Sequence, residues 1–223
     1  KERCRKLLEA KMWIESQRTM HGDAIIACND SAVAADAEKT APGTATATAP
    51  AGIPGPEHPA LIRDLYAGAM TLLENNNNLL PLGRLDQLRV ATVSVNRLAM
   101  TEFQRMTDRY TNADHYFIDP SNQQGAQFVL SKLRDYDIVI AGFCALEQKP
   151  AGLYGVTPAL NRVFAQIASL ERSAIIWFGN PYGVARLDMT ARPSALLVAY
   201  QDNSYTHQVA VQVLFGAIGA SGR

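Results

Sequence analysis

Glu102 is the residue of this sequence whose type and surroundings best suit acid–base chemistry. It lies seven residues after the apolar stretch "LRVATVSV" (88–95), and Arg97 stands between the two. A carboxyl group near a scissile bond can donate or accept a proton. A glutamate in the first turn of a helix is also stabilised by the helix dipole, without any catalytic role. We expect that structural role and keep Glu102 as the one candidate acid/base.

Other polar side chains stand where similar apolar stretches end. In an open parallel sheet, the loops after the strands form the ligand crevice, so we predict that these side chains line a substrate crevice. They are Asn96, Arg97, Asn180 and Asp202. The segment "GNPYG" (179–183) also has a simpler explanation, because Asn, Pro and Gly supply the backbone angles of a tight turn.

The cysteines and histidines show no spacing typical of a metal or redox site. Cys144 and Glu147 in "GFCALE" suggest a nucleophile, but a catalytic cysteine needs a base and an electropositive setting that the sequence does not reveal. We expect Cys144 to be a small buried thiol. Zinc sites gather three or four ligands, and the four histidines form no H-x-x-x-H pair. Without a glycine-rich phosphate loop, we predict neither a metal nor a cofactor.

Helical and strand-like stretches alternate after residue 59 and must position these side chains. Strands are predicted at 88–95, 115–119, 136–143, 173–180 and 194–200, and helices at 60–73, 101–110, 124–134, 157–170 and 206–217. Several strands are almost continuously apolar, as in parallel sheets covered by helices. The pattern predicts an α/β fold: an open, mostly parallel, doubly wound sheet with helices on both faces.

The first 59 residues differ from this pattern. Apolar residues at near-helical spacing predict a helix within residues 1–18. Residues 19–59 become rich in Ala, Thr, Pro and Gly and can bury little apolar surface, so we predict a flexible linker there. The folded domain is expected over residues 60–223.

The run "LLENNNNLLPL", which begins at Leu72, places four asparagines between apolar residues. We predict that Leu72 and Leu73 end the buried face of the first helix of this domain. The asparagines would close that helix, because asparagine tolerates the left-handed conformation. The three following leucines would then return the chain to the core.

Composition excludes several partners. With 21 basic and 21 acidic side chains, the formal net charge is zero, so no basic surface for nucleic acid or anionic lipid is expected. No apolar run approaches the ~20 residues that span a bilayer, and no membrane segment is predicted. The sequence leaves the compartment and the oligomeric state open.

Three segments together resemble the second domain of glycoside hydrolase family 3. "GAMTLLENNNNLLPL" (68–82) is similar to the family's entry helix and "LL-x-N-x-x-x-LLPL" signature, and "IIWFGNPYGV" (175–184) to a strand and turn often written "FGNPY". The segment 193–223 is similar to the closing strand and helix. "CRKLLEAKMWI" (4–14) resembles the helix that ends the family's first domain. The likeness covers 59–223 in order.

The resemblance implies a carbohydrate-active parent protein. The family's enzymes are retaining exo-β-glycosidases whose first domain, a barrel, carries an aspartate nucleophile. That barrel would precede Lys1 in the same polypeptide and would be the partner of this chain, with a carbohydrate as substrate. Because the reaction needs two carboxyl groups within ~5 Å of each other, we predict that this chain alone is inactive. The resemblance also favours an extracytoplasmic location, periplasmic or secreted.

Two branches of the family differ in what the second domain supplies. In the β-glucosidase-like branch, a glutamate on a long crevice loop, commonly beside a tryptophan, is the acid/base. Here residues 96–110 are short and contain no tryptophan, so Glu102 matches poorly. In the β-N-acetylglucosaminidase-like branch, a His/Asp pair of the first domain transfers the proton. We therefore expect the non-catalytic C-terminal domain of an exo-acting β-N-acetylhexosaminidase, which packs beside the barrel and shapes the sugar site.

Two interpretations of other classes stay open. A stand-alone flavodoxin-like module could bind a small ligand or a protein partner in the same crevice. A purely structural or dimerising domain would bind no ligand at all. Calorimetry with mononucleotides, flavins and N-acetylglucosamine would separate the first from the second, and solution mass at several concentrations would reveal a dimer.

Overall fold

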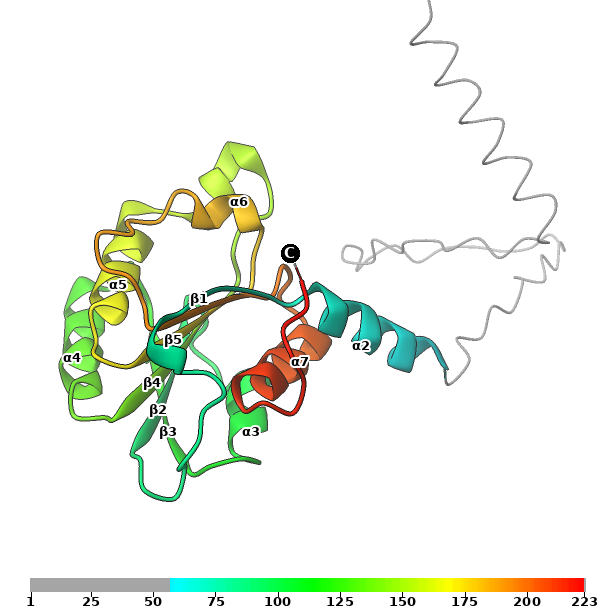
Figure 1. Ribbon diagram of the computed structural model, residues 1–223. Coiled ribbons are helices and arrows are strands. Elements are labelled where there is room, and N and C mark those ends of the chain that lie inside the picture. Colours follow the sequence, from blue (N-terminus) through cyan, green and yellow to red (C-terminus); the bar gives the residue numbers. More distant parts are fainter. Residues whose placement is uncertain (1–56, 223) are drawn as a thin grey trace, which may run out of the picture. The chain divides into compact units, whose positions relative to one another are not determined.

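A computed structural model describes residues 57–222, which form a six-stranded sheet covered by helices on both faces (Figure 1). The strand order is β1-β6-β5-β4-β2-β3. The strands are β1 (Thr71–Asn75), β2 (Val90–Val95), β3 (Ala113–Ile118), β4 (Ile138–Phe143), β5 (Ser173–Trp177) and β6 (Ala195–Val198). All neighbours pair in parallel except β1, which runs antiparallel to β6 at one edge. The predicted mostly parallel α/β fold is confirmed.

The helices divide between the two faces of the sheet. They are α2 (Glu57–Ala69), α3 (Glu102–Thr107), α4 (Gln123–Leu133), α5 (Pro158–Ala168), α6 (Pro181–Val184) and α7 (Ser204–Leu214), with 3-10 turns η1 (Asn76–Asn78) and η2 (Pro150–Gly155). Helices α4 and α5 cover one face, and α3 and α7 cover the other, where α2 packs on α7 (Figure 1). Among residues 57–222, no helix has both the length and the apolarity to cross a membrane.

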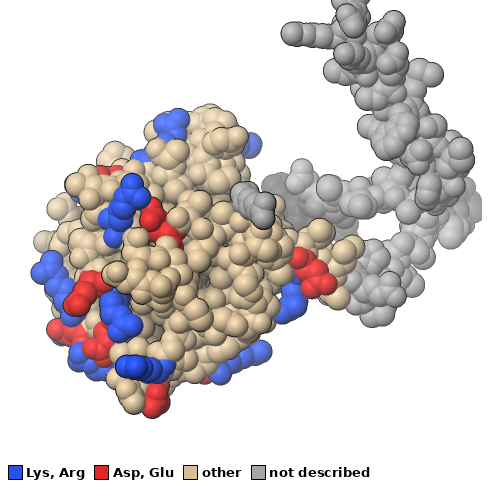
Figure 2. Space-filling model, viewed as in Figure 1, with Lys and Arg blue, Asp and Glu red and all other residues tan. Residues whose placement is uncertain are grey.

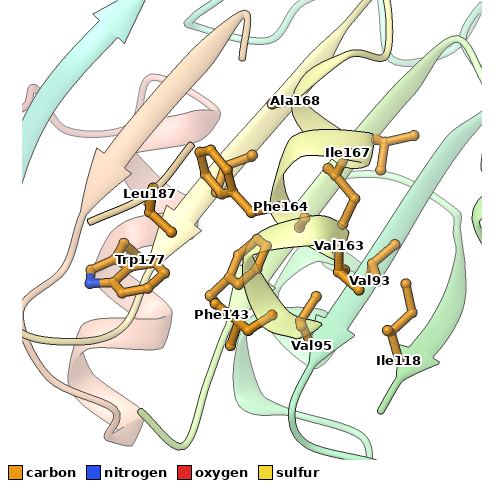
Figure 3. Packing of buried hydrophobic residues seen from close by; sticks show 14 of the residues in the cluster. Val93, Val95, Ile118, Phe143, Val163, Phe164, Ile167, Ala168, Trp177 and Leu187 are labelled. Carbon is orange, nitrogen blue, oxygen red and sulfur yellow. The ribbon is translucent and has the colours of Figure 1, made fainter. Parts of the chain in front are cut away.

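The central strands are buried on both sides, which explains their apolar sequences. In β5, Ile175 and Trp177 face the α4/α5 layer, whereas Ala174 and Ile176 face the α3/α7 layer. Successive side chains of a strand point to opposite faces, so a strand between two helical layers needs apolar residues throughout. Figure 3 shows the first of these cores, in which Trp177 packs beside Phe143, with ring centroids 5.8 Å apart.

The predicted helix over residues 60–73 is wrong in its last four residues. Helix α2 ends at Ala69, and Thr71–Asn75 is strand β1, paired with β6. The predicted buried face is also wrong, because Leu65 of that helix is 64% exposed. Spacing alone cannot separate a short apolar run in a helix from one in a strand. The hydrogen-bonding edge that β6 offers decides this case in favour of the strand.

The asparagine run makes a tight turn after a strand rather than a helix end. Asn77 and Asn78 adopt left-handed φ angles of 56° and 51°, so their predicted conformation is confirmed. The Asn75 side chain accepts a hydrogen bond from the backbone N–H of Leu80 at 2.9 Å and donates to its carbonyl at 3.1 Å. Leu80 and Leu82 are buried, which confirms the predicted return to the core.

Two predictions fall beyond the described residues. The helix at 1–18 lies outside them, as does all but the end of the linker at 19–59, and both stay predictions. Helix α2 begins at Glu57, three residues before the expected start of the domain. On the face in Figure 2, positive and negative side chains are interspersed rather than gathered into a block of one sign, which agrees with the zero net charge.

Gly142 gives a direct test of how α3 packs on the sheet. A Cβ at Gly142, the next-to-last residue of β4, would lie 2.5 Å from Cε1 of the buried Phe103. Overpacking of this kind costs about 1–3 kcal/mol, and we expect Gly142→Ala to lower the free energy of unfolding by that amount in urea titrations. Gly68→Ala, in α2 with open space around the site, should instead be neutral or stabilising. Equal free energies of unfolding for the Gly142→Ala and Gly68→Ala variants would contradict the close packing of Phe103 on β4.

Candidate functional site

Asp202 lies just after β6 and joins the ends of three strands. Its Oδ2 accepts hydrogen bonds from the Arg97 guanidinium, in the loop after β2, at 2.8 Å and from the backbone N–H of Ala145, after β4, at 2.7 Å. Its Oδ1 accepts from Nε2 of His207 in α7 at 2.8 Å. We call Asn96, Arg97, Asp202 and His207 the Asp202 network.

Asn96 closes the network from the end of β2. Its φ angle of 70° lies in the left-handed region, which asparagine adopts more readily than most residues. From this position its Nδ2 donates to the carbonyls of Cys144 at 3.2 Å and Ala145 at 3.0 Å. The structure thus brings together three of the four predicted crevice residues, Asn96, Arg97 and Asp202, and their contact with a substrate stays a prediction.

His207 is a buried anchor of this network. Its side chain is 4% exposed, and its Nδ1 accepts the backbone N–H of Phe103, at the start of α3, at 3.3 Å. Because Nδ1 is an acceptor there, the hydrogen-bond pattern assigns the proton to Nε2, which donates to Asp202. The imidazole also packs on Phe178, with ring centroids 4.0 Å apart. Both ring nitrogens are engaged, so His207 has no free lone pair for a substrate proton.

Asp202 is held in its charged form. Burial opposes ionisation, but the hydrogen bonds from His207 and from the Ala145 N–H outweigh it. The nearby positive charge of Arg97 acts in the same direction, and the pKa of Asp202 is lowered. A carboxylate with these partners is suited to holding loops in place, because hydrogen bonds to the charged form stabilise it.

Cys144 lies buried beside this network, as predicted, and its thiol is unreactive. Burial, with a smaller contribution from the charge of Asp202, raises the pKa of the thiol to about 12, so it stays protonated at neutral pH. Ligand atoms of Cys144, Asp202 and His207 lie within 4.8 Å of one another, a grouping that could hold a metal ion. The Nε2 atom carries a proton and both Asp202 oxygens accept hydrogen bonds, so a cation would have to break these contacts. The group therefore suits a structural role.

Glu102 begins α3, in the helix-start position that its sequence suggested. Its Oε1 accepts from Nε2 of Gln208 and its Oε2 from Nε of Arg105, both at 3.0 Å. The hydrogen bond from Gln208 first, and that from Arg105 next, lower the pKa of Glu102 against a small opposing effect of burial. A general acid must hold its proton near the working pH, whereas these contacts favour the carboxylate.

Asn180, the fourth predicted crevice residue, makes separate contacts around α6. Its Oδ1 accepts the backbone N–H of Tyr182 at 3.0 Å, and its Nδ2 donates to the carbonyl of Gln148 at 3.3 Å. Its own carbonyl accepts the indole N–H of Trp177 at 3.0 Å. The predicted tight turn is instead the one-turn helix α6, which Asn180 caps, and neither Gly179 nor Gly183 has a positive φ angle. Asn180 also ties α6 to the loop that leads into η2.

Solved structures with the same arrangement of strands and helices belong to much longer enzymes. A glycoside hydrolase family 3 β-N-acetylglucosaminidase from Paenibacillus sp. str. FPU-7 matches 85% of this chain and 35% of its own, with TM-score 0.60 and 14% identity. A fungal multi-domain GH3 β-N-acetylglucosaminidase with a GCN5-related glucosamine N-acetyltransferase region matches 74% of this chain and 18% of its own, with TM-score 0.59 and 22% identity. A β-glucosidase from Listeria innocua matches 74% of this chain and 26% of its own, with TM-score 0.55 and 15% identity.

This chain shares its fold with part of glycoside hydrolase family 3 enzymes. It spans about a third or less of the length of those proteins. No protein-family model matches the sequence, and no curated protein is significantly similar to it. The comparison therefore establishes the fold, and the activities of those enzymes belong to them.

His207 is the site residue that sequence patterns failed to single out. It lies five residues after Asp202 and was considered only as one of four scattered histidines. A local signal did exist, because Asn203 caps α7 and thus fixes His207 in the first turns of that helix, close to Asp202. The contact with Phe103, 104 residues away, has no such signal.

Proposed function

We propose that this chain is the non-catalytic C-terminal domain of an exo-acting β-glycosidase, of the β-N-acetylhexosaminidase kind. In this role it packs beside a catalytic barrel of the same polypeptide and shapes the rim of the sugar site. The resemblance to glycoside hydrolase family 3 supports the proposal, and so does the fold shared with β-N-acetylglucosaminidases.

The observation that carries the proposal is that the four titratable groups discussed for the candidate site, Asp202, His207, Glu102 and Cys144, are already engaged or hold an unsuitable protonation state. Asp202 accepts three hydrogen bonds, and His207 uses both ring nitrogens. Glu102 has a lowered pKa, and Cys144 has a raised one. A proton-transfer residue needs a free lone pair or an available proton near neutral pH, so catalysis in the parent would depend on groups of another domain.

The partner and domain order follow from the same proposal. The barrel would be joined through the helix at 1–18 and the linker at 19–59, and a carbohydrate would be its substrate. An extracytoplasmic location, periplasmic or secreted, is part of the proposal because it accords with the resemblance. Neither a metal nor a cofactor is needed for the role that we assign to this chain.

The alternative is a β-glucosidase in which this domain supplies Glu102 as acid/base. Its supporting observations are the shared fold with a β-glucosidase and the partial exposure of the Glu102 side chain, 27%. The lowered pKa of Glu102 argues against it.

Glu102→Gln separates the two functions in a polypeptide that carries both the barrel and this domain. We expect kcat/KM on an aryl N-acetyl-β-glucosaminide to stay near the wild-type value, because Glu102 acts in α3 and not on the substrate. Loss of a true acid/base would cost about 10²–10⁴-fold. Glu147→Gln, at an exposed position after β4, is the matched control.

The chain of residues 1–223 should by itself release no aryl alcohol from such substrates. Turnover by the highly purified chain that Glu102→Gln abolishes would overturn the proposal and restore Glu102 as catalytic.

A further inference from the structure

We propose that Tyr154 and Tyr182 form a stacking platform for one pyranose ring of a carbohydrate. The proposal rests on the proposed function and deepens it by naming the residues of this chain that would touch the sugar. It concerns a part of the strand-end face that the Asp202 network does not use. The aromatic pair lies on two segments, η2 and α6, that follow β4 and β5 respectively.

The two rings present aromatic surface to solvent. Tyr182 is 69% exposed, the largest value among the large apolar and aromatic side chains of residues 57–222. The Tyr154 ring is half-buried, with its centroid 6.0 Å from that of Tyr182 and an angle of 34° between the rings. Leu153, next to Tyr154, is 49% exposed. An aromatic side chain left in water forgoes the large gain from burial, so an exposed pair suggests a ligand.

The fold holds the backbone that carries the two rings before any ligand binds. Asn180 accepts the backbone N–H of Tyr182 and is itself tied to Gln148 and Trp177. Gly183 brings α6 close to η2, since a Cβ there would lie 3.2 Å from Cβ of Tyr154 and 2.9 Å from the Trp177 ring. Figure 1 shows the yellow-green turns of η2 beside α6. Fixing this backbone in advance lowers the entropy cost of binding.

Backbone strain marks the same place. Leu153 and Tyr154 have left-handed φ angles of 52° and 56°, and Gly155 follows at 78°. For leucine and tyrosine this conformation is unfavourable, and such strain persists where the surrounding structure imposes it, often at ligand sites. Here it turns Tyr154 towards α6, where its ring meets Tyr182 and, at 5.9 Å, the guanidinium of Arg186.

The chemistry of the platform fits a sugar. One face of a pyranose ring carries mainly C–H groups with slight positive charge, and the face of a tyrosine ring is negative. The hydroxyls at the edge of the sugar need hydrogen-bond partners, and the exposed Arg186 and the tyrosine hydroxyls supply donors beside the rings. Ligand sites of this kind combine an apolar surface with a few placed polar groups.

The test is a titration of the full 223-residue chain with chitotriose, cellotriose and maltotriose, followed by NMR shifts of tyrosine ring signals. We expect chitotriose to bind with a dissociation constant of about 1 mM, a strength accessible to a single exposed platform. Tyr182→Ala should weaken binding roughly tenfold, because one stacked ring is lost. Tyr182→Phe keeps the ring and should remain within about twofold of the wild type.

Phe128→Ala is the matched control, because Phe128 is an equally exposed ring, 66%, on α4 and away from η2 and α6. It should leave binding unchanged. Failure of all three sugars to bind the folded wild-type chain would overturn the platform, as would unchanged binding by Tyr182→Ala. Neither result affects the proposed function, which the Glu102→Gln assay decides. Preference for cellotriose at the same tyrosines would uphold the platform and contradict the N-acetylhexosamine assignment of the proposed function.

Discussion

Asp202→Asn is expected to lower the free energy of unfolding by about 2–3 kcal/mol, although the substitution changes the side-chain shape very little. Asp202 accepts on both oxygens, from His207 on one side and from Arg97 and Ala145 on the other. An asparagine can accept on only one side, so its NH₂ group must face a donor. The loss is smaller than the 3–5 kcal/mol typical of a fully buried pair, because the Arg97 side chain is 45% exposed. Urea unfolding at pH 7 measures it.

Asp188→Asn is the matched control. The Asp188 carboxylate also accepts two hydrogen bonds, both from Thr190, and its pKa is also lowered by them. It is exposed and stabilises only its own turn, so its replacement should hardly change stability. Equal effects of the two substitutions would show that the Asp202 network does not hold the strand ends together.

The effect of Asp202→Asn should depend on pH. The folded-state pKa of Asp202 lies below its unfolded-state value, so its contribution to stability is complete above the unfolded pKa of about 4 and is lost as pH falls towards the folded pKa. We expect the stability difference between wild type and variant to be constant from pH 7 to about pH 5 and to shrink below about pH 4. A difference that stayed constant at acid pH would contradict the assignment of Asp202 as a carboxylate stabilised by the fold.

Trp177→Ala is expected to destabilise the chain by about 3–5 kcal/mol, the usual cost of removing a buried aromatic side chain. Trp177 is fully buried and packs beside Phe143 in the core between the sheet and α4 and α5 (Figure 3). Its indole N–H also donates to the carbonyl of Asn180. Its removal therefore leaves a cavity in the core and takes away one of the two hydrogen bonds of the Asn180 carbonyl, which keeps the one from the backbone N–H of Gly183. Urea or thermal unfolding of the wild type and the variant measures this loss of stability.

Two companion variants divide this effect into its parts. Trp177→Phe keeps most of the packing and loses the indole hydrogen bond, so it should cost less than the alanine variant. Tyr182→Ala removes an aromatic ring that is 69% exposed and should change stability by less than about 0.5 kcal/mol. A large loss of stability in Tyr182→Ala would mean that the ring supports the fold and is not available to a ligand.

The alternation of elements was predictable because both of its signals are local. Helices found at α3, α4, α5 and α7 match the predicted ranges to within a few residues, and the apolar strands gave the parallel sheet. The start of the domain was less clear, since the apolar spacing of residues 62–73 suits a helix. Strand β1 exists because its backbone pairs with β6, more than 100 residues away.

The candidate site was predictable only in its location. The rule that ligands approach the carboxyl ends of parallel strands pointed to Asn96, Arg97 and Asp202, which the structure places in one network. It could not separate them from Asn180, which makes its contacts around α6. The rule also gave no indication that Tyr154 and Tyr182, 28 residues apart, would come together.

The sequence by itself determined the class of fold, the order of its elements and the edge of the sheet where polar side chains gather, because these follow from residue spacing along the chain. Only the tertiary structure decided what those side chains do. The ionisation of Asp202 and Glu102, the tautomer of His207 and the pairing of two exposed tyrosines depend on partners brought from distant segments. The physical reason is that pKa values and hydrogen bonds are set by what lies within a few ångströms in space, which residue spacing does not specify.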